Sequence, residues 1–296
     1  MTATIAGAPS PGLPPRTGSS VARPAAGARL TGREGPGKVA CLPFPAMKVN
    51  GRRTANGTGT LLGVWAHPDD EAYLSAGLMA TARAAGHRVV VATATLGERG
   101  TPDPDRWPPA RLGPVREEEM TRSLAAVDVH DHRWLHHADG TLAQVPIERG
   151  ATQIGELIAE VCPDTIVTFG PDGMTGHPDR RAVSRWVTRA WLASRRRARL
   201  WYATLTPDFH RRWDAVNREV GLWYPGTRPP CHPVDDLACS VTCTGEMLNR
   251  KMAALRAHDS QTAPLIERIG ADLYRQWWAG EYFVEALTDH RDADAA

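Results

Sequence analysis

The sequence lacks the features that mark several protein classes. Its five cysteines contain no Cys-x-x-Cys pair, which argues against a cysteine zinc knuckle and against a disulfide framework. No apolar run reaches transmembrane length, and the N-terminus lacks the apolar core of a secretory signal. The formal net charge is only +2, so the composition predicts neither a nucleic-acid-binding surface nor a membrane-binding one. We therefore expect a reduced, cytoplasmic protein.

Residues 1–58 differ in composition from the rest of the chain. Pro, Gly, Ala, Ser and Arg dominate this stretch and no apolar periodicity is visible, so it cannot bury enough surface to offset the entropy lost on ordering. We predict that it is a disordered extension, or the product of a start codon upstream of the true one, for which Met47 is a candidate. The folded domain is expected at residues 59–290, a length that allows a large core.

Beyond residue 58, apolar runs of strand length alternate with segments of helical periodicity. The strands are expected at 61–66, 87–94, 131–136, 165–169, 200–205 and 234–241, and one helix is expected from Pro114 to about Val127. Continuous apolar runs fit parallel strands that are covered on both faces. The pattern predicts a three-layer, Rossmann-like α/β fold with a mostly parallel sheet, helices on both faces and a small antiparallel C-terminal addition. No G-x-G-x-x-G follows the first strand, which argues against a nucleotide-binding protein.

The most informative stretch, residues 66–71, reads AHPDDE and follows the first expected strand. A helix follows it, because apolar residues recur at helical spacing from Ala72 to Ala82. In open α/β sheets, ligands bind at such carboxyl ends of strands. One imidazole and two adjacent carboxylates can supply metal ligands together with a separate proton acceptor. A lone Asp in this place would more simply cap the helix.

A second polar loop, residues 170–181, follows the strand expected at 165–169. Within it, residues 176–180 read GHPDR, and a helix follows with Val183, Trp186 and Trp191 on its buried face. This loop also lies at the carboxyl end of a strand, so we expect its polar side chains beside those of the first motif.

Together these motifs resemble those of the LmbE/PIG-L family of zinc-dependent N-deacetylases, over roughly residues 61–283. The resemblance implies that His67 and Asp70 bind Zn²⁺ and that Asp69 is the general base. It also implies that His177 assists catalysis.

Arg116 and Glu119 resemble the family's R-x-x-E pattern, in which the arginine helps to hold the sugar substrate. The alternative is an ordinary ion pair between neighbours on a helix surface.

One position departs from the family pattern. The second motif of the family ends in the histidine that is the third zinc ligand, whereas this chain has Arg180, which is always protonated and has no lone pair for a metal. Three alternatives stay open. His177 could become the third ligand at the cost of its catalytic role, or another histidine could complete the site. In the third alternative the metal and the activity are lost, and Arg180 makes a salt bridge to Asp69 or Asp70. The other candidate histidines are His130, His210, His232 and His258.

The resemblance predicts a metal-dependent hydrolase that removes an N-acyl group, in the first instance acetyl, from an amino sugar or sugar conjugate. The rival hypothesis is a non-catalytic sugar-binding or regulatory protein with a degenerate metal site. Neither hypothesis involves a nucleic acid or a membrane, and the sequence predicts no oligomeric state. We expect the histidines at 130, 132 and 136 to lie on the surface, and Trp277 and Trp278 to dock a terminal helix on the core.

Overall fold

The computed structural model describes residues 48–49, 52–53, 58–101, 103–227 and 231–286. The predicted N-terminal extension therefore lies largely outside the described residues. Within it, the structure contains two short strands, β1 (Lys48–Val49) and β2 (Arg52–Arg53).

One mixed sheet organises the described residues, with the strand order β2-β1-β8-β9-β7-β6-β3-β4-β5. Five of its strands are parallel, namely β3 (Leu61–Trp65), β4 (Val89–Thr93), β5 (Asp131–Trp134), β6 (Thr165–Phe169) and β7 (Arg199–Thr204). Antiparallel pairing extends the sheet beyond β7 through β9 (Gly280–Glu285) and β8 (Cys239–Thr242). The predicted fold class, including its antiparallel C-terminal addition, is confirmed.

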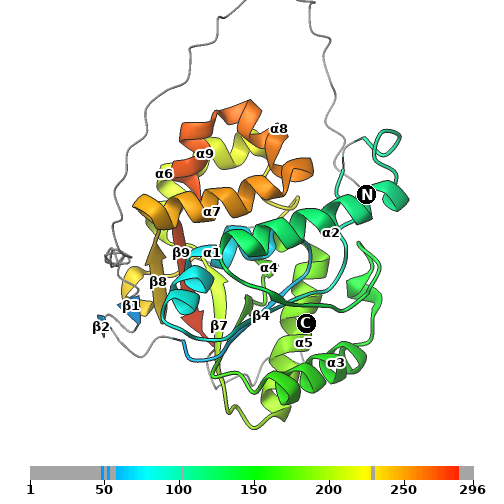
Figure 1. The fold of residues 1–296 in the computed structure, drawn as a ribbon, viewed down its shortest axis with the longest axis vertical. Coiled ribbons are helices and arrows are strands. Elements are labelled where there is room, and N and C mark those ends of the chain that lie inside the picture. The colour runs from blue at the N-terminus through cyan, green and yellow to red at the C-terminus, as the bar shows by residue number, and fades with distance from the viewer. Residues whose placement is uncertain (1–47, 50–51, 54–57, 102, 228–230, 287–296) are drawn as a thin grey trace, which may run out of the picture. The chain divides into compact units, whose positions relative to one another are not determined.

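Helices cover both faces of the sheet (Figure 1). α1 (Asp70–Ala84) and α2 (Pro109–Ala126) pack against α7 (Gly245–Ala257) on one face, whereas α3 (Ile147–Val161) and α5 (Pro178–Ala193) pack together on the other. The remaining helical segments are η1 (Leu142–Gln144), α4 (Gly173–Gly176), α6 (Pro207–Val220), η2 (Val234–Asp236), α8 (Asp259–Ile269) and α9 (Ala271–Trp277). Of the helices in the described ranges, none has the length and apolar composition needed to cross a lipid bilayer.

The strand order reverses between β3 and β6. β3 pairs with β4 on one side and with β6 on the other, so the chain moves outward from β3 in both directions. A crevice forms at such a reversal, outside the carboxyl ends of the two strands. The two sequence motifs follow β3 and β6, so the topology alone brings them together.

A buried ion pair ties the antiparallel addition to α1. Lys251 Nζ lies 2.6 Å from Glu281 Oε1, and both side chains are fully buried. The Glu281 carboxylate also accepts hydrogen bonds from the backbone N–H groups of Gly77 and Leu78, and Lys251 donates to the carbonyl oxygen of Tyr73. The two buried charges therefore compensate each other and are both hydrogen-bonded, which makes their burial tolerable.

Two boundaries differ from the sequence prediction. α2 begins at Pro109 rather than at Pro114, and Pro114 lies within its first turns. Pro114 has no N–H to donate to the carbonyl of Ala110, one turn earlier, so it interrupts the hydrogen-bond pattern inside the helix rather than starting it. The strand expected at 234–241 is shorter, since η2 occupies its first residues and only β8 pairs with β9.

Candidate functional site

The two motifs meet at the carboxyl edge of the sheet. The turn between β3 and α1 carries His67, and the loop before α5 carries His177. Their rings lie edge to face with centroids 4.9 Å apart. The juxtaposition expected from the sequence is therefore present in the structure.

His67 lies among three carboxylates. Its Nε2 is 3.2 Å from Asp139 Oδ1 and 3.3 Å from Asp179 Oδ2, and its Nδ1 is 3.6 Å from Asp70 Oδ2. Burial by itself lowers the pKa of His67, but the hydrogen bonds to Asp139 and Asp179 and the charge of Asp70 outweigh it and raise the pKa to about 9. The three carboxylates therefore favour the protonated ring, which would have to lose its proton to bind a metal.

Asp139 and Asp179 were not selected from the sequence. Asp179 accepts hydrogen bonds from the backbone N–H groups of Gly140 and Leu142, at 2.7 and 3.0 Å. Burial favours a higher pKa for both carboxyls, but the bond to His67 holds the pKa of each below its usual range. Asp139 follows β5 at the same edge of the sheet as the two motifs.

Asp69 has a strained backbone. Its φ of 98° lies in the left-handed region, which non-glycine residues rarely occupy. The surrounding contacts hold it there, since its N–H donates to Glu71 Oε2 at 3.0 Å and its Oδ2 lies 3.1 Å from Arg116 Nη2. Burial raises the pKa of Asp69, and the charge of Arg116 opposes the rise. Strain of this kind concentrates at functional sites.

Arg116 is buried and donates hydrogen bonds to residues of the first motif. Its guanidinium donates to the carbonyl oxygens of Gly97 and Pro68 in addition to Asp69. Glu119 instead accepts hydrogen bonds from the N–H and Oγ of Ser260, at 2.6 and 2.7 Å. The alternative of a surface ion pair between Arg116 and Glu119 is therefore wrong, because both side chains are buried and they bind different partners.

Arg180 pairs with Asp70, which is the salt bridge named in the third alternative, whereas the loss of metal and activity in that alternative stays a prediction. Its Nη2 lies 2.6 Å from Asp70 Oδ1, and its Nη1 donates to Thr175 Oγ1 at 2.6 Å. Asp70 is almost fully buried, so the guanidinium compensates a charge that water does not reach. The ligand set that the family resemblance implies therefore does not fit a metal here, because Arg180 covers Asp70 and offers no lone pair.

Another set of donors could hold a metal ion. Among the described residues, His67, His177 and Asp179 each place one ligand atom within 4.8 Å of the others. Two imidazoles and one carboxylate match the donors of catalytic zinc sites, so this set fits such an ion. Burial lowers the pKa of His177 to about 4, with the charges of His67 and Arg180 adding to the effect. A neutral imidazole is the form that binds a metal.

The other candidate histidines lie outside this set. His258 Nε2 is 2.9 Å from Glu71 Oε1, His232 Nδ1 is 2.8 Å from Thr204 Oγ1, and exposed His130 contacts Asp128. His210 packs its ring against Phe209 and Trp223. His130 and His136 are exposed as expected, whereas His132 is half-buried.

A cavity of about 270 Å³ opens beside the first motif. Asp69, Asp70 and Arg180 form its polar end. Its other walls come from α1, α4, α6, α8, α9 and the residues that follow α6 and α9, and they are mainly apolar. Trp277 and Trp278 are among them, and both are buried as expected for residues docked on the core.

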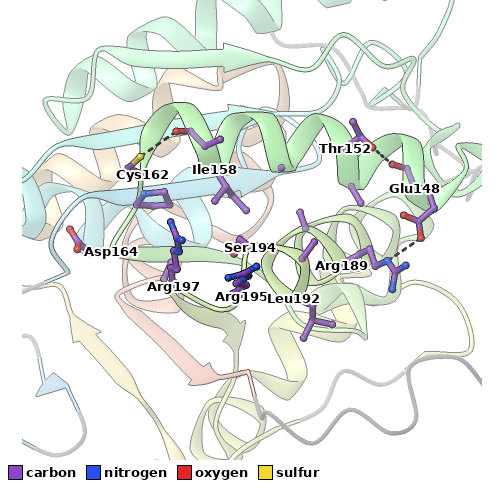
Figure 2. Close-up of a pocket in the computed structure, with 17 residues that line it drawn as sticks. Glu148, Thr152, Ile158, Cys162, Asp164, Arg189, Leu192, Ser194, Arg195 and Arg197 are labelled. Carbon is purple, nitrogen blue, oxygen red and sulfur yellow. Dashed lines mark hydrogen bonds and ion pairs between the residues drawn. The ribbon is translucent and has the colours of Figure 1, made fainter.

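A separate hollow of about 1110 Å³ lies between α3 and α5, away from the motifs (Figure 2). Figure 2 shows Arg189 paired with Glu148 at one end and Arg195 and Arg197 nearer the other. No residue of either motif lines this hollow. Size therefore does not locate the functional site, whereas the gathering of polar groups at the strand ends does.

Fold and site together define an α/β protein whose candidate site lies at the carboxyl ends of the strands, where the strand order reverses. The sequence pattern of the PIG-L family, described as GlcNAc-PI de-N-acetylase, matches residues 62–191. The chain is also 32% identical over 242 residues to a 1D-myo-inositol 2-acetamido-2-deoxy-alpha-D-glucopyranoside deacetylase of Nocardia farcinica, which covers 69% of this chain and 80% of the relative. This chain belongs to the PIG-L family.

Two further comparisons agree. The deacetylase of the same name from Thermomonospora curvata is 30% identical over 274 residues, which cover 75% of this chain and 89% of the relative. The solved structure of the N,N'-diacetylchitobiose deacetylase of Pyrococcus horikoshii aligns with a TM-score of 0.56, at 18% identity, over 77% of this chain and 84% of that one. At that identity the structural likeness shows the fold alone.

Proposed function

We propose that this protein hydrolyses the N-acyl group of an amino-sugar conjugate. The observation that carries the proposal is the meeting of His67, Asp69 and Asp70 with His177 and Asp179 at one edge of the sheet. Membership of the PIG-L family supports it, as do the names of two relatives that act on an N-acetylglucosamine linked to inositol.

The ion that we propose for the site is Zn²⁺, held by His67, His177 and Asp179. When bound, it would supply a Lewis acid that polarises the amide carbonyl and acidifies water. In this assignment His177 is a metal ligand and no longer has the catalytic role that the family resemblance implies. In the same assignment Asp70 is not a metal ligand, and it keeps its ion pair with the Arg180 guanidinium 2.6 Å away.

Asp69 is the proposed general base. Its backbone strain and its contact with Arg116 fix the carboxylate at the polar end of the cavity. The water oxygen bonds to the carbonyl carbon, the C–N bond breaks, and the amine departs with the proton that Asp69 took from the water. Arg180 also lines this end, where its positive charge stabilises the negative charge that develops on the carbonyl oxygen.

A second candidate function is sugar binding without catalysis. The ion pair between Arg180 and Asp70 favours it, because a guanidinium cation already neutralises the carboxylate that a metal would need. His177 Nδ1 also accepts the backbone N–H of Asp179 at 3.2 Å, and this bond requires that nitrogen to be unprotonated. In a neutral ring the proton then sits on the other nitrogen, which cannot bind a metal in that form.

Metal analysis combined with an amine-release assay separates the two functions. We expect about one zinc per chain after reconstitution, and amine release from the inositol conjugate of N-acetylglucosamine. Asp69→Asn should abolish release, whereas Asp105→Asn, at an exposed site away from the motifs, should not. A protein that binds the conjugate without metal and without releasing amine would refute the hydrolase proposal and support the second candidate.

A further inference from the structure

The cavity beside the first motif is larger than an acetyl group needs, and many of its lining side chains are apolar. Its volume is about 270 Å³, whereas a water molecule takes up roughly 30 Å³. The apolar lining residues are Leu74, Met174, Val220, Leu222, Leu265, Trp277 and Trp278. Such a chamber is suited to an extended apolar group.

Polar side chains in the walls are already engaged within the protein. The Tyr73 hydroxyl is hydrogen-bonded to the Tyr274 hydroxyl at 2.7 Å, and Gln261 Nε2 donates to Ser260 Oγ at 3.0 Å. Thr175 Oγ1 accepts from Arg180. A sugar ring placed here would bury hydroxyls with few partners, and unpartnered buried hydroxyls are costly. An alkyl chain loses no hydrogen bonds on entering the same space.

The position of the cavity selects which part of the substrate enters it. Asp69, the proposed base, lines the polar end, so the carbonyl carbon lies at this end during hydrolysis. The group attached directly to that carbon is the acyl chain, and the apolar walls extend from the same point. The sugar is attached to the carbonyl carbon through the amide nitrogen, so it extends in the opposite direction from the acyl chain.

We propose that this cavity holds the acyl chain of the substrate and that the chain is an alkanoyl group longer than acetyl. The proposal rests on the proposed hydrolase function for the orientation of the substrate. Its test is therefore binding, measured separately from turnover.

The experiment compares N-acetyl-, N-butanoyl- and N-hexanoyl-glucosamine as ligands of the full chain carrying Asp69→Asn, by calorimetry. Burial of a methylene contributes about 0.8 kcal/mol, or roughly fourfold in Kd, so we expect hexanoyl to bind at least about tenfold more tightly than acetyl. Leu265→Trp places a larger side chain in the cavity wall and should remove this gain. Glu267→Trp, an exposed position on the same helix, should retain it.

Affinity that does not depend on acyl length would overturn the proposal. The proposal would also be overturned if an octyl aglycone on N-acetylglucosamine tightened binding and Leu265→Trp removed that gain in affinity. The cavity would then hold the aglycone instead of the acyl chain. Hydrolysis by the wild-type chain is followed in parallel. No hydrolysis of these amides or of their inositol conjugates, together with an intact gain from chain length, would refute the proposed function and leave the cavity assignment supported.

Discussion

Replacing Arg180 with histidine should convert the polar cluster into a stronger metal site. The substitution removes the cation that lies 2.6 Å from Asp70 Oδ1 and adds an imidazole at the position where the family has its third ligand. Asp70 is then free to coordinate beside His67. We therefore expect Arg180→His to bind zinc more tightly than the wild-type chain.

The structure sets the size of the stability changes. Removing one partner of a buried ion pair costs about 3–5 kcal/mol. Because 20% of the Arg180 side chain is exposed, solvent screening reduces the expected loss in the metal-free variant to about 2 kcal/mol. Zinc at a hundredfold excess over its Kd restores about 2.7 kcal/mol. For a chain of this size that stabilisation raises Tm by about 5 to 10 °C.

Thermal unfolding with and without zinc measures the stability changes, and elemental analysis measures the zinc content. The matched control is Arg180→Gln, which also loses the ion pair with Asp70 but gains no imidazole. Without metal, it should be destabilised to a similar extent as Arg180→His. On addition of zinc, its Tm should rise less than that of Arg180→His. Equal zinc content and equal Tm shifts in the two variants would refute the inference that a histidine at position 180 can join the metal site.

Three further outcomes concern the scaffold. Lys251→Met should lower the free energy of unfolding by about 3–5 kcal/mol in urea titrations, because Glu281 is left charged and buried without its partner. Burial lowers the pKa of His132 to about 4, so the unfolded chain binds more protons than the folded one below its ordinary pKa of about 6.5. This group should therefore remove up to about 2 kcal/mol of stability as the pH falls from neutral to about 5, and His132→Gln should flatten that pH dependence. Gly150→Ala should destabilise by about 1–3 kcal/mol, because a Cβ there would lie 2.2 Å from the Trp186 ring; an unchanged Tm would show that α3 and α5 can move apart.

Local patterns were sufficient to predict the parallel part of the fold. The apolar runs at 61–66 and 165–169 are bounded by turn residues and polar motifs, so strand identity and the position of the two motifs follow from sequence alone. The juxtaposition of the motifs also follows, because parallel strands place their carboxyl ends on one edge.

Contacts across the sheet edge could not be predicted in the same way. Asp139 reaches His67 only because β5 lies next to β4 in a particular register, and no local signal specifies that register. Arg116 occurs in a helical pattern that fits a surface ion pair equally well. Its burial depends on carbonyl oxygens of Gly97 and Pro68, which belong to loops remote in sequence.

Hydrolysis in ¹⁸O-labelled water tests the central claim most directly. The zinc-reconstituted full chain is incubated with an N-acyl amino-sugar conjugate, and the released acid is analysed by mass spectrometry. We predict a free carboxylic acid that carries one ¹⁸O atom from water, formed by the wild-type chain and not by Asp69→Asn. An intact conjugate that remains bound to the zinc-loaded protein would contradict the account.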